Sequence, residues 1–247
     1  MLSVISPVMT LSYGQENDMQ TAGGYENILA FTDSLAGRKT IDSSGNGTWS
    51  WSTGADFVTS YIWRGNRQGR GPHLQPYVEC SAGPFTGGVW GTFDFNRYRE
   101  VDLYLAMDLP GGFIIGLQDY WMADLQFSDF TAESGSHALE VSIGYESEHV
   151  SLNANYIINE AGGAGSSGGD IYIESRFSFD YFSVFMGAGN GWHTDEGRFM
   201  VCNVGIDTGW EIDLSDSFLI PVTAQMCYNP DSGRVFFTAG LSISTGR

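Results

Sequence analysis

The stretch VDLYLAMDL at residues 101–109 alternates large apolar side chains with small, acidic or aromatic ones. A two-residue period places successive side chains on opposite faces of a β-strand, whereas a helix would space apolar residues by three and four. The same alternation returns about twelve times along the chain, for example at 139–146 and 150–158. The sequence therefore predicts an all-β protein.

The repeats define a series of strands separated by short and long connections. Strands are predicted near residues 49–64, 73–82, 86–95, 99–109, 113–122, 137–146, 150–158, 170–180, 182–189, 199–213, 218–228 and 235–244. Their number is even, most have the length needed to cross a bilayer at a tilt, and short turns alternate with mostly longer loops, as in bacterial outer-membrane barrels. We therefore expect one domain over 48–247, a closed antiparallel transmembrane β-barrel of about 12 strands with up-and-down meander topology.

The position of aromatic residues indicates which face meets lipid. On the apolar parity they gather at the short-turn ends (Phe57, Phe85, Phe113, Tyr145, Phe179, Phe182, Trp210 and Phe218) and at the loop ends (Trp63, Phe95, Trp121, Tyr156, Tyr228 and Phe237). Two aromatic girdles around an aliphatic band are typical of two membrane interfaces. A secreted β-sandwich, with its apolar face turned inward, remains the alternative. Asp119 falls on the lipid parity near the loop end of its strand, where a bulge or an early exit of the strand would be needed to accommodate it.

The N-terminal region differs from the strand series. Residues 1–14 resemble a secretory signal without its basic start, or else form an ordinary apolar tail, and residues 15–47 are expected to be a flexible tail or small plug. Together with the barrel pattern, this predicts the outer membrane of a Gram-negative bacterium.

Charge and cysteine content exclude several classes of protein. The formal net charge is -18, with 29 acidic and 11 basic residues, which disfavours nucleic acid as a partner. Strand parity predicts that Cys202 and Cys227 face opposite sides of the sheet and cannot bridge, and Cys80 is isolated. No spacing of cysteine or histidine indicates a metal or a cofactor.

Two segments carry a family resemblance. GADFVTSYIWRG at 54–65 and GPHLQPYVECSAGPFTGGVWGTFDF at 71–95 resemble the first three strands of the TorF-type porin family. The resemblance implies an outer-membrane channel of poorly defined substrate and supplies no catalytic residues.

The polar parity of the strands carries a large excess of acids. We expect these carboxylates, with a single clear cation, to line the lumen: Asp56, Glu79, Asp94, Asp102, Asp108, Glu140, Glu146, Glu174, Asp207 and Glu211, against Arg176. An acidic aqueous path through low-dielectric walls concentrates cations. The alternative is that these acids simply keep the lumen hydrated.

Arginines cluster in the first two outward loops. Five are expected at one mouth of the barrel: Arg64, Arg67, Arg70, Arg97 and Arg99. They could gather substrate, form a constriction or clamp the phosphates of lipid headgroups, because a guanidinium makes bidentate contacts, or they could be scattered loop charges.

The function that follows is passive diffusion of small hydrophilic solutes or ions, with a cation bias. The alternative is a plugged structural or adhesion barrel that acts through its extracellular loops, since a barrel of this size can be open or filled. Catalysis is not expected, because none of the four histidines shares a motif with a nucleophile. The expected partners are outer-membrane lipid and small solutes, while substrate identity and oligomeric state stay open.

Overall fold

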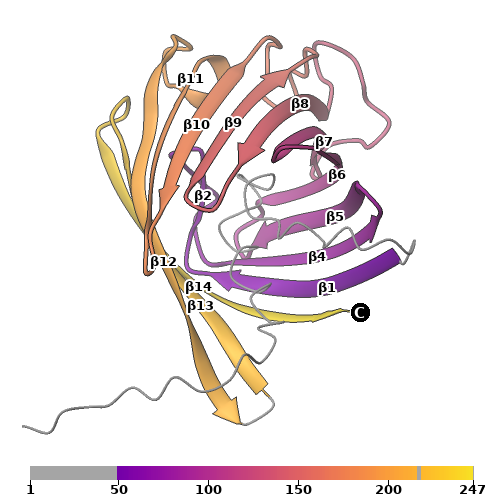
Figure 1. Ribbon diagram of the computed structural model, residues 1–247. Helices are drawn as coiled ribbons and strands as arrows, with labels where there is room; N and C mark the ends of the chain where they lie inside the picture. Colours follow the sequence, from indigo (N-terminus) through magenta and orange to yellow (C-terminus); the bar gives the residue numbers. More distant parts are fainter. Residues whose placement is uncertain (1–48, 216–217, 247) are drawn as a thin grey trace, which may run out of the picture.

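Twelve strands of the computed structural model, which describes residues 49–215 and 218–246, close into a single barrel (Figure 1). Each strand pairs antiparallel with its sequence neighbours, and β1 closes the ring by pairing with both β4 and β14. The barrel strands are β1 (Trp49–Val58), β4 (His73–Ala82), β5 (Phe85–Asp94), β6 (Arg99–Leu109), β7 (Phe113–Met122), β8 (His137–Glu146), β9 (Val150–Ile157), β10 (Ile171–Ser178), β11 (Ser183–Gly189), β12 (Met200–Ser215), β13 (Phe218–Asn229) and β14 (Arg234–Gly246). The predicted meander of about 12 strands is confirmed.

The predicted signal at 1–14 and the tail or plug at 15–47 lie outside the described residues. Among residues 49–215 and 218–246, no helix has the length and apolar character needed to cross a membrane.

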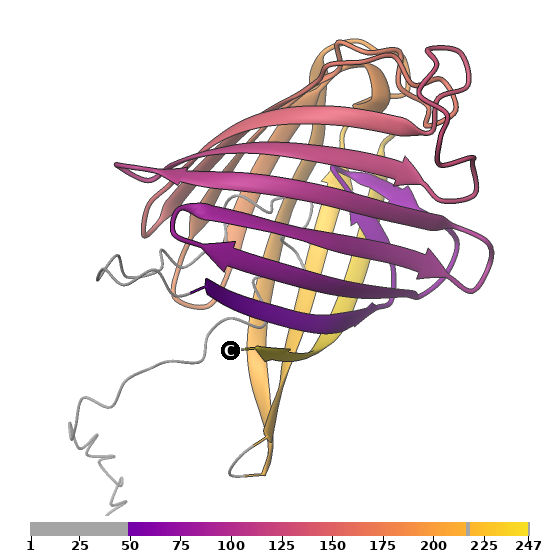
Figure 2. The same ribbon diagram turned by 90° about the vertical axis from the view of Figure 1, so that its right-hand side faces the viewer.

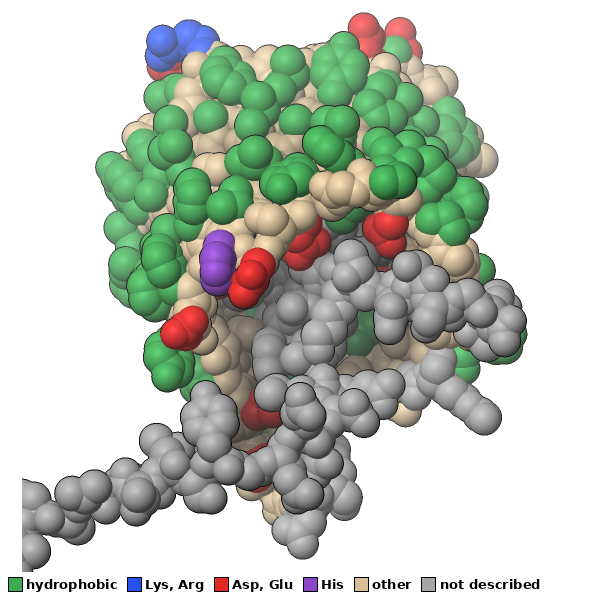
Figure 3. Space-filling view, in the orientation of Figure 1, with side chains coloured by type: hydrophobic (Ala, Val, Ile, Leu, Met, Phe, Trp, Pro, Cys, Tyr) green, Lys and Arg blue, Asp and Glu red, His purple; other side chains and the backbone are tan. Residues whose placement is uncertain are grey.

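The apolar parity of each strand points outward. In β6, Leu103 and Leu105 are 42% and 53% exposed, whereas Asp102 and Ala106 on the opposite parity are buried. Figure 3 shows the consequence: hydrophobic side chains cover the outer wall, and acidic ones appear in the opening. A soluble sandwich would bury the apolar parity, so the outward apolar wall excludes that alternative. A closed barrel satisfies every ladder hydrogen bond without an edge, as a membrane requires. The closed ring and its apolar outer face are the features of a membrane-spanning β-barrel.

The aromatic girdles are present, with two corrections in the first strand and one in β12, where Trp210 lies beyond the part that pairs with β11. Phe85 and Phe113 are exposed at short-turn ends, and Phe237 at a loop end. Trp63, however, is 5% exposed and lies in the interior, and Phe57 stands next to Val58 at the loop end of β1. Both errors arise because the first barrel strand ends six residues earlier than predicted.

The chain after Val58 turns into the barrel and forms a separate hairpin. Strands β2 (Tyr61–Trp63) and β3 (Asn66–Gln68) pair across Trp63 and Asn66, leaving Arg64 and Gly65 as a two-residue turn. Their φ angles are 48° and 82°, which is the type I′ geometry that matches the twist of a hairpin. The segment predicted to cross the membrane at 59–64 is therefore part of a loop.

The hairpin of β12 and β13 extends beyond the wall at the short-turn end (Figures 1 and 2). Strand β11 pairs with β12 as far as Asp207, and β14 pairs with β13 from Val222 onward, so residues 208–215 pair with β13 alone. Glu211 lies on this extension and is exposed. It was predicted to line the lumen, and the structure places it outside.

Asp119 is satisfied by a hydrogen bond with His137. Its carboxylate lies 2.9 Å from Nδ1 of His137, while Nε2 of the same ring lies 2.6 Å from the Phe127 carbonyl. Phe130 stacks on the imidazole at 4.3 Å between ring centroids. The loop at 123–136 thus covers an outward-facing polar pair, and the predicted bulge is not needed.

The cysteines depart from the parity prediction. The register of the β11–β12 pairing shifts between Gly187 and Ala188 of β11, opposite the segment of β12 that holds Cys202. Cys202 and Cys227 are both completely or almost completely buried and both are free, with the Cys227 thiol 2.9 Å from Oδ1 of Asn203. Simple alternation fails at Cys202 because a bulge interrupts it.

Candidate functional site

The β2–β3 hairpin occupies the lumen at the loop end of the barrel. Its side chains touch residues of strands that are not neighbours in the wall: Tyr61 packs on Trp90 of β5, Arg64 binds Glu140 of β8, and Asn229 of β13 donates to the carbonyl of Gly65. A segment on the outer surface could not reach all three strands. The first outward loop therefore folds inward and narrows the barrel from within.

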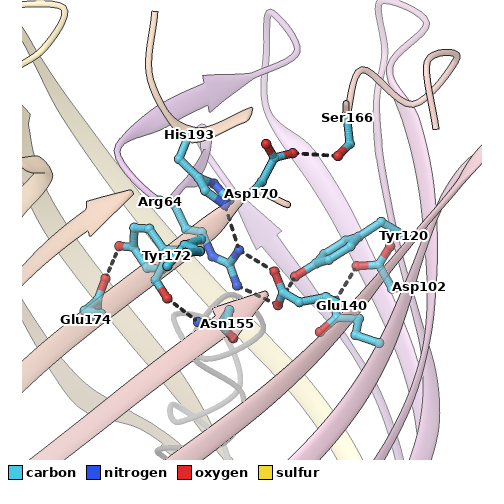
Figure 4. Close-up of polar contacts among 12 residues, drawn as sticks. Arg64, Asp102, Tyr120, Glu140, Asn155, Ser166, Asp170, Tyr172, Glu174 and His193 are labelled. Atoms are coloured by element: carbon cyan, nitrogen blue, oxygen red, sulfur yellow. Dashed lines mark hydrogen bonds and ion pairs between the residues drawn. The ribbon is translucent and has the colours of Figure 1, made fainter. Parts of the chain in front are cut away.

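Arg64 is the centre of these contacts (Figure 4). Its Nη1 and Nη2 donate to Oε2 and Oε1 of Glu140 at 2.6 and 2.8 Å, and the Tyr120 hydroxyl donates to the same carboxylate at 3.1 Å. The guanidinium carbon lies 4.8 Å from the ring centroid of Trp63 and 4.6 Å from that of Tyr172. A bidentate carboxylate and two aromatic faces are the arrangement that a planar guanidinium favours.

The tip of the hairpin fits closely against the far wall. A Cβ on Gly65 would lie 1.9 Å from the carbonyl oxygen of Cys202, so no larger residue fits there in this position. Asn66 donates to the carbonyl of His193 at 3.0 Å, and Asn229 donates to the Gly65 carbonyl at 3.0 Å. These backbone contacts fix how deeply the hairpin enters.

Aromatic rings fill the space around the hairpin. Trp63 meets Tyr120 and Trp192 at centroid separations of 5.6 and 5.0 Å, and Tyr61 meets Trp90 at 5.5 Å. These rings belong to one buried cluster that fills the loop end of the lumen around the hairpin. Tyrosines and tryptophans on the polar parity thus pack against the hairpin in this structure.

Arg64 is charged, whereas His193 beside it is neutral. Burial by itself would lower the pKa of Arg64, but the Glu140 carboxylate outweighs burial and holds that pKa above its ordinary value. Burial, and then the nearby Arg64 charge, hold the pKa of His193 well below its usual range. Nη1 of Arg64 lies 3.5 Å from Nε2 of His193, so a neutral imidazole faces the guanidinium.

The predicted luminal acids, Glu211 apart, lie on the inward parity, with different partners. Asp56 accepts from the Ser242 hydroxyl at 2.7 Å, and Asp102 from the Gln118 amide at 3.0 Å. Asp56 and Asp102 each retain one buried oxygen without a hydrogen-bond partner. Glu79 accepts from the Tyr104 hydroxyl at 2.7 Å.

A second ionic group lies nearer the short-turn end of the lumen. Arg176 pairs with Asp207, and its Nη2 lies 3.6 Å from Glu174. Glu174 also accepts from the Tyr172 hydroxyl and from the amide of Asn203, at 2.9 Å for the amide. Arg176, expected as the single clear cation among the luminal acids, is therefore paired with two of them.

Asp94 has a local role at the rim. It accepts from the backbone N–H groups of Arg70, Asn96 and Tyr98, each at 2.8 Å. It therefore joins the first two outward loops. Sequence reasoning missed Glu100 on the next strand, which is 4% exposed and accepts from the Tyr98 hydroxyl at 2.5 Å.

Four of the five predicted mouth arginines are exposed near the rim. Arg67, Arg70, Arg97 and Arg99 lie on the first two outward loops or directly after them, and Arg99 is 3.9 Å from Asp124. Arg64 does not join them, since it is 3% exposed and bound within the lumen. The structure thus divides the predicted cluster into a rim group and a single luminal residue.

The histidines have different surroundings. His73 and His193 are buried beside the hairpin, and both ring nitrogens of His137 face partners. Within residues 49–215 and 218–246, no three His, Cys, Asp or Glu side chains are grouped so as to hold a metal ion.

Comparison with known proteins gives structural likeness alone. No family model and no curated protein matches the sequence. The crystal structure of Acinetobacter baumannii OccAB3 is similar with a TM-score of 0.38 and 9% identity, covering 83% of this chain and 66% of that one. A variant porin of Rh. blastica gives 0.31 and 8% over 80% of this chain and 100% of that one. Outer membrane phospholipase A from Escherichia coli gives 0.35 and 8% over 88% and 96%. Similarities this low carry no conclusion about activity, and membership of the TorF-type family stays a prediction.

Proposed function

We propose that this barrel is a cation-preferring channel for small hydrophilic solutes and ions, not an enzyme, with an aperture set by the β2–β3 hairpin. The observation that carries the proposal is the charge of the inward face. Carboxylates on that face far outnumber the guanidinium groups of Arg64 and Arg176. Because a low-dielectric wall focuses the field of such groups into the aqueous path, cations are concentrated and anions repelled.

The acids best suited to a test lie toward the short-turn end of the barrel, away from the hairpin. Glu79, Asp108 and Glu146 are partly exposed on the inward parity, where water and mobile ions reach them. None of them contacts Arg64, so their replacement by amides leaves the hairpin anchor in place. Amides keep the volume and hydrogen bonding of these side chains and remove the charge.

The experiment measures reversal potentials across planar bilayers in a KCl gradient. The wild type is expected to favour K⁺ over Cl⁻, and the variant Glu79→Gln/Asp108→Asn/Glu146→Gln is expected to lose most of that preference. Glu211→Gln/Asp213→Asn is the matched control, since it removes acids from the exposed extension outside the lumen. Equal selectivity in the wild type and the luminal variant would contradict the cation bias.

A plugged structural barrel is the second candidate, and the same hairpin favours it. Its anchors come from two wall strands, through Glu140 and Asn229, and from the loop between β11 and β12, through His193. If folded wild-type protein and a variant with a displaced hairpin both fail to conduct, the plugged barrel replaces the channel.

A further inference from the structure

Arg64 is held in the manner of a bound ligand. The barrel supplies a carboxylate from β8, a hydroxyl from β7 and an aromatic face from β10, through Glu140, Tyr120 and Tyr172. The Tyr172 ring is held in turn by Glu174 and Asn203, to which its hydroxyl is hydrogen bonded. Each of these groups belongs to the wall, and the hairpin contributes the guanidinium and Trp63.

The local sequence of the turn does not explain an arginine at this position. A type I′ turn requires positive φ at both central residues, and Asn-Gly is its favoured pair. Arg64 instead takes up φ 48°, a conformation uncommon for a residue with a long side chain. The contact made by the guanidinium therefore accounts for arginine better than the turn does.

The guanidinium reaches the pocket on a chain segment that is separate from the wall. Hairpin and barrel pair through no shared β-ladder, since β2 and β3 form a sheet of their own. If the hairpin withdraws, the wall retains Glu140 with its aromatic neighbours in the lumen. A free cation of the same shape can then make the contacts that Arg64 makes.

We propose that the Glu140 pocket is a luminal binding site for solutes that carry a guanidinium group, and that Arg64 is a tethered competitor for it. This inference rests on the proposed luminal path, because a solute has to reach the pocket through the barrel. The hairpin closes the luminal path when Arg64 fills the pocket, and a guanidinium solute opens the path by displacing Arg64. Solutes that carry a guanidinium group would thereby open the channel that they pass through.

The test uses free guanidinium as the probe and removes the tethered competitor. Arg64→Asn empties the pocket while supplying the residue that a type I′ turn prefers. The folded barrel in detergent is heated with 0 to about 20 mM guanidinium chloride, and unfolding is followed by gel mobility. For a dissociation constant of about 5 mM, the midpoint should rise by about 2–4 °C.

Three controls make the result specific. Urea is planar and neutral, so it should give no shift at the same concentration. The wild type should show a smaller shift than Arg64→Asn, because its pocket is occupied. The double variant Arg64→Asn/Glu140→Gln lacks the carboxylate and should show none.

The outcomes separate this inference from the channel proposal. Equal shifts with urea and guanidinium, or equal shifts with and without Glu140, would overturn the binding site. If Arg64→Asn does not fold by itself, refolding yield becomes the readout: recovery with guanidinium and not with urea supports the site, and recovery with neither overturns it. The unfolding midpoint is measured without any ion current, so this test can be read even if the barrel does not conduct and the channel proposal fails.

Discussion

Gly65 is the position at which one methyl group should displace the hairpin. A Cβ there would lie 1.9 Å from the carbonyl oxygen of Cys202, and non-bonded atoms pack at about 3.5 Å. In Gly65→Ala the tip must therefore retreat by about 1.5 Å. A retreat of that size moves Arg64 from 2.6 and 2.8 Å beyond hydrogen-bonding distance of Glu140.

The free-energy change favours withdrawal strongly. With alanine at residue 65, the original hairpin position can no longer keep the buried ion pair of Arg64 and Glu140, and that position therefore loses at least about 3 kcal/mol. A loss of about 3 kcal/mol corresponds to a shift of roughly a hundredfold toward the displaced hairpin.

The assay is single-channel current in planar bilayers, with gel mobility as the measure of folding. Gly65→Ala should conduct more, or more often, than the wild type and should remain folded, because the change affects the hairpin and not the wall. Gly83→Ala is the matched control: it also replaces a glycine of positive φ, 58°, but nothing lies within 4 Å of its Cβ. Currents of Gly65→Ala indistinguishable from those of the wild type would refute the reasoning.

Three further predictions concern the wall, the contact of the hairpin with His193, and the loop at 123–136. Ile143→Arg should destabilise the barrel by about 2–4 kcal/mol because its side chain faces lipid, whereas Ser142→Arg on the opposite face should be much milder; equal losses in urea unfolding would show that the faces are misassigned. When the hairpin lies in the lumen, burial and the Arg64 charge lower the pKa of His193. This position of the hairpin is therefore favoured above pH about 6.5, the ordinary pKa of histidine, and should lose stability as the pH falls from there to the lowered pKa. The charged or titratable groups facing His193 are Arg64 and Tyr172, so open probability should rise from pH 7.5 to 5.5 in the wild type and rise less in His193→Gln. Asp119→Asn should loosen the loop at 123–136, which depends on the Asp119–His137 pair, and limited proteolysis should cut that loop faster than in Asp124→Asn, where the loop loses an exposed acid instead.

The wall of the barrel was predictable because a membrane imposes a strict rule on it. Every strand exposes one face to lipid and the other to the lumen, so a two-residue period appears directly in the sequence. Deviations occur where that rule is relaxed. Cys202 lies at a register shift, and Glu211 lies on an extension that leaves the wall.

The luminal hairpin was missed although the chain carried a signal for it. The first strand was predicted over 49–64, which is 16 residues, while a tilted strand crosses the membrane in about 9–11. The excess length at 59–64 belongs to the hairpin, whose alternation of Tyr61 and Trp63 resembles that of a wall strand. The contact of Arg64 with Glu140 joins residues 76 positions apart, and no local pattern encodes such a pair.

In the channel that we propose, the same excess of acid accounts for both closure and selectivity, but through interactions of different range. Glu140 holds Arg64 by two short contacts in a buried setting, where salt screens little. The partly exposed acids Glu79, Asp108 and Glu146 act on ions through water, where the screening length falls to about 3 Å at 1 M salt. Rising ionic strength should therefore weaken the preference for cations well before it releases the hairpin. An aperture that persists at high salt while selectivity fades is what this division of charges implies.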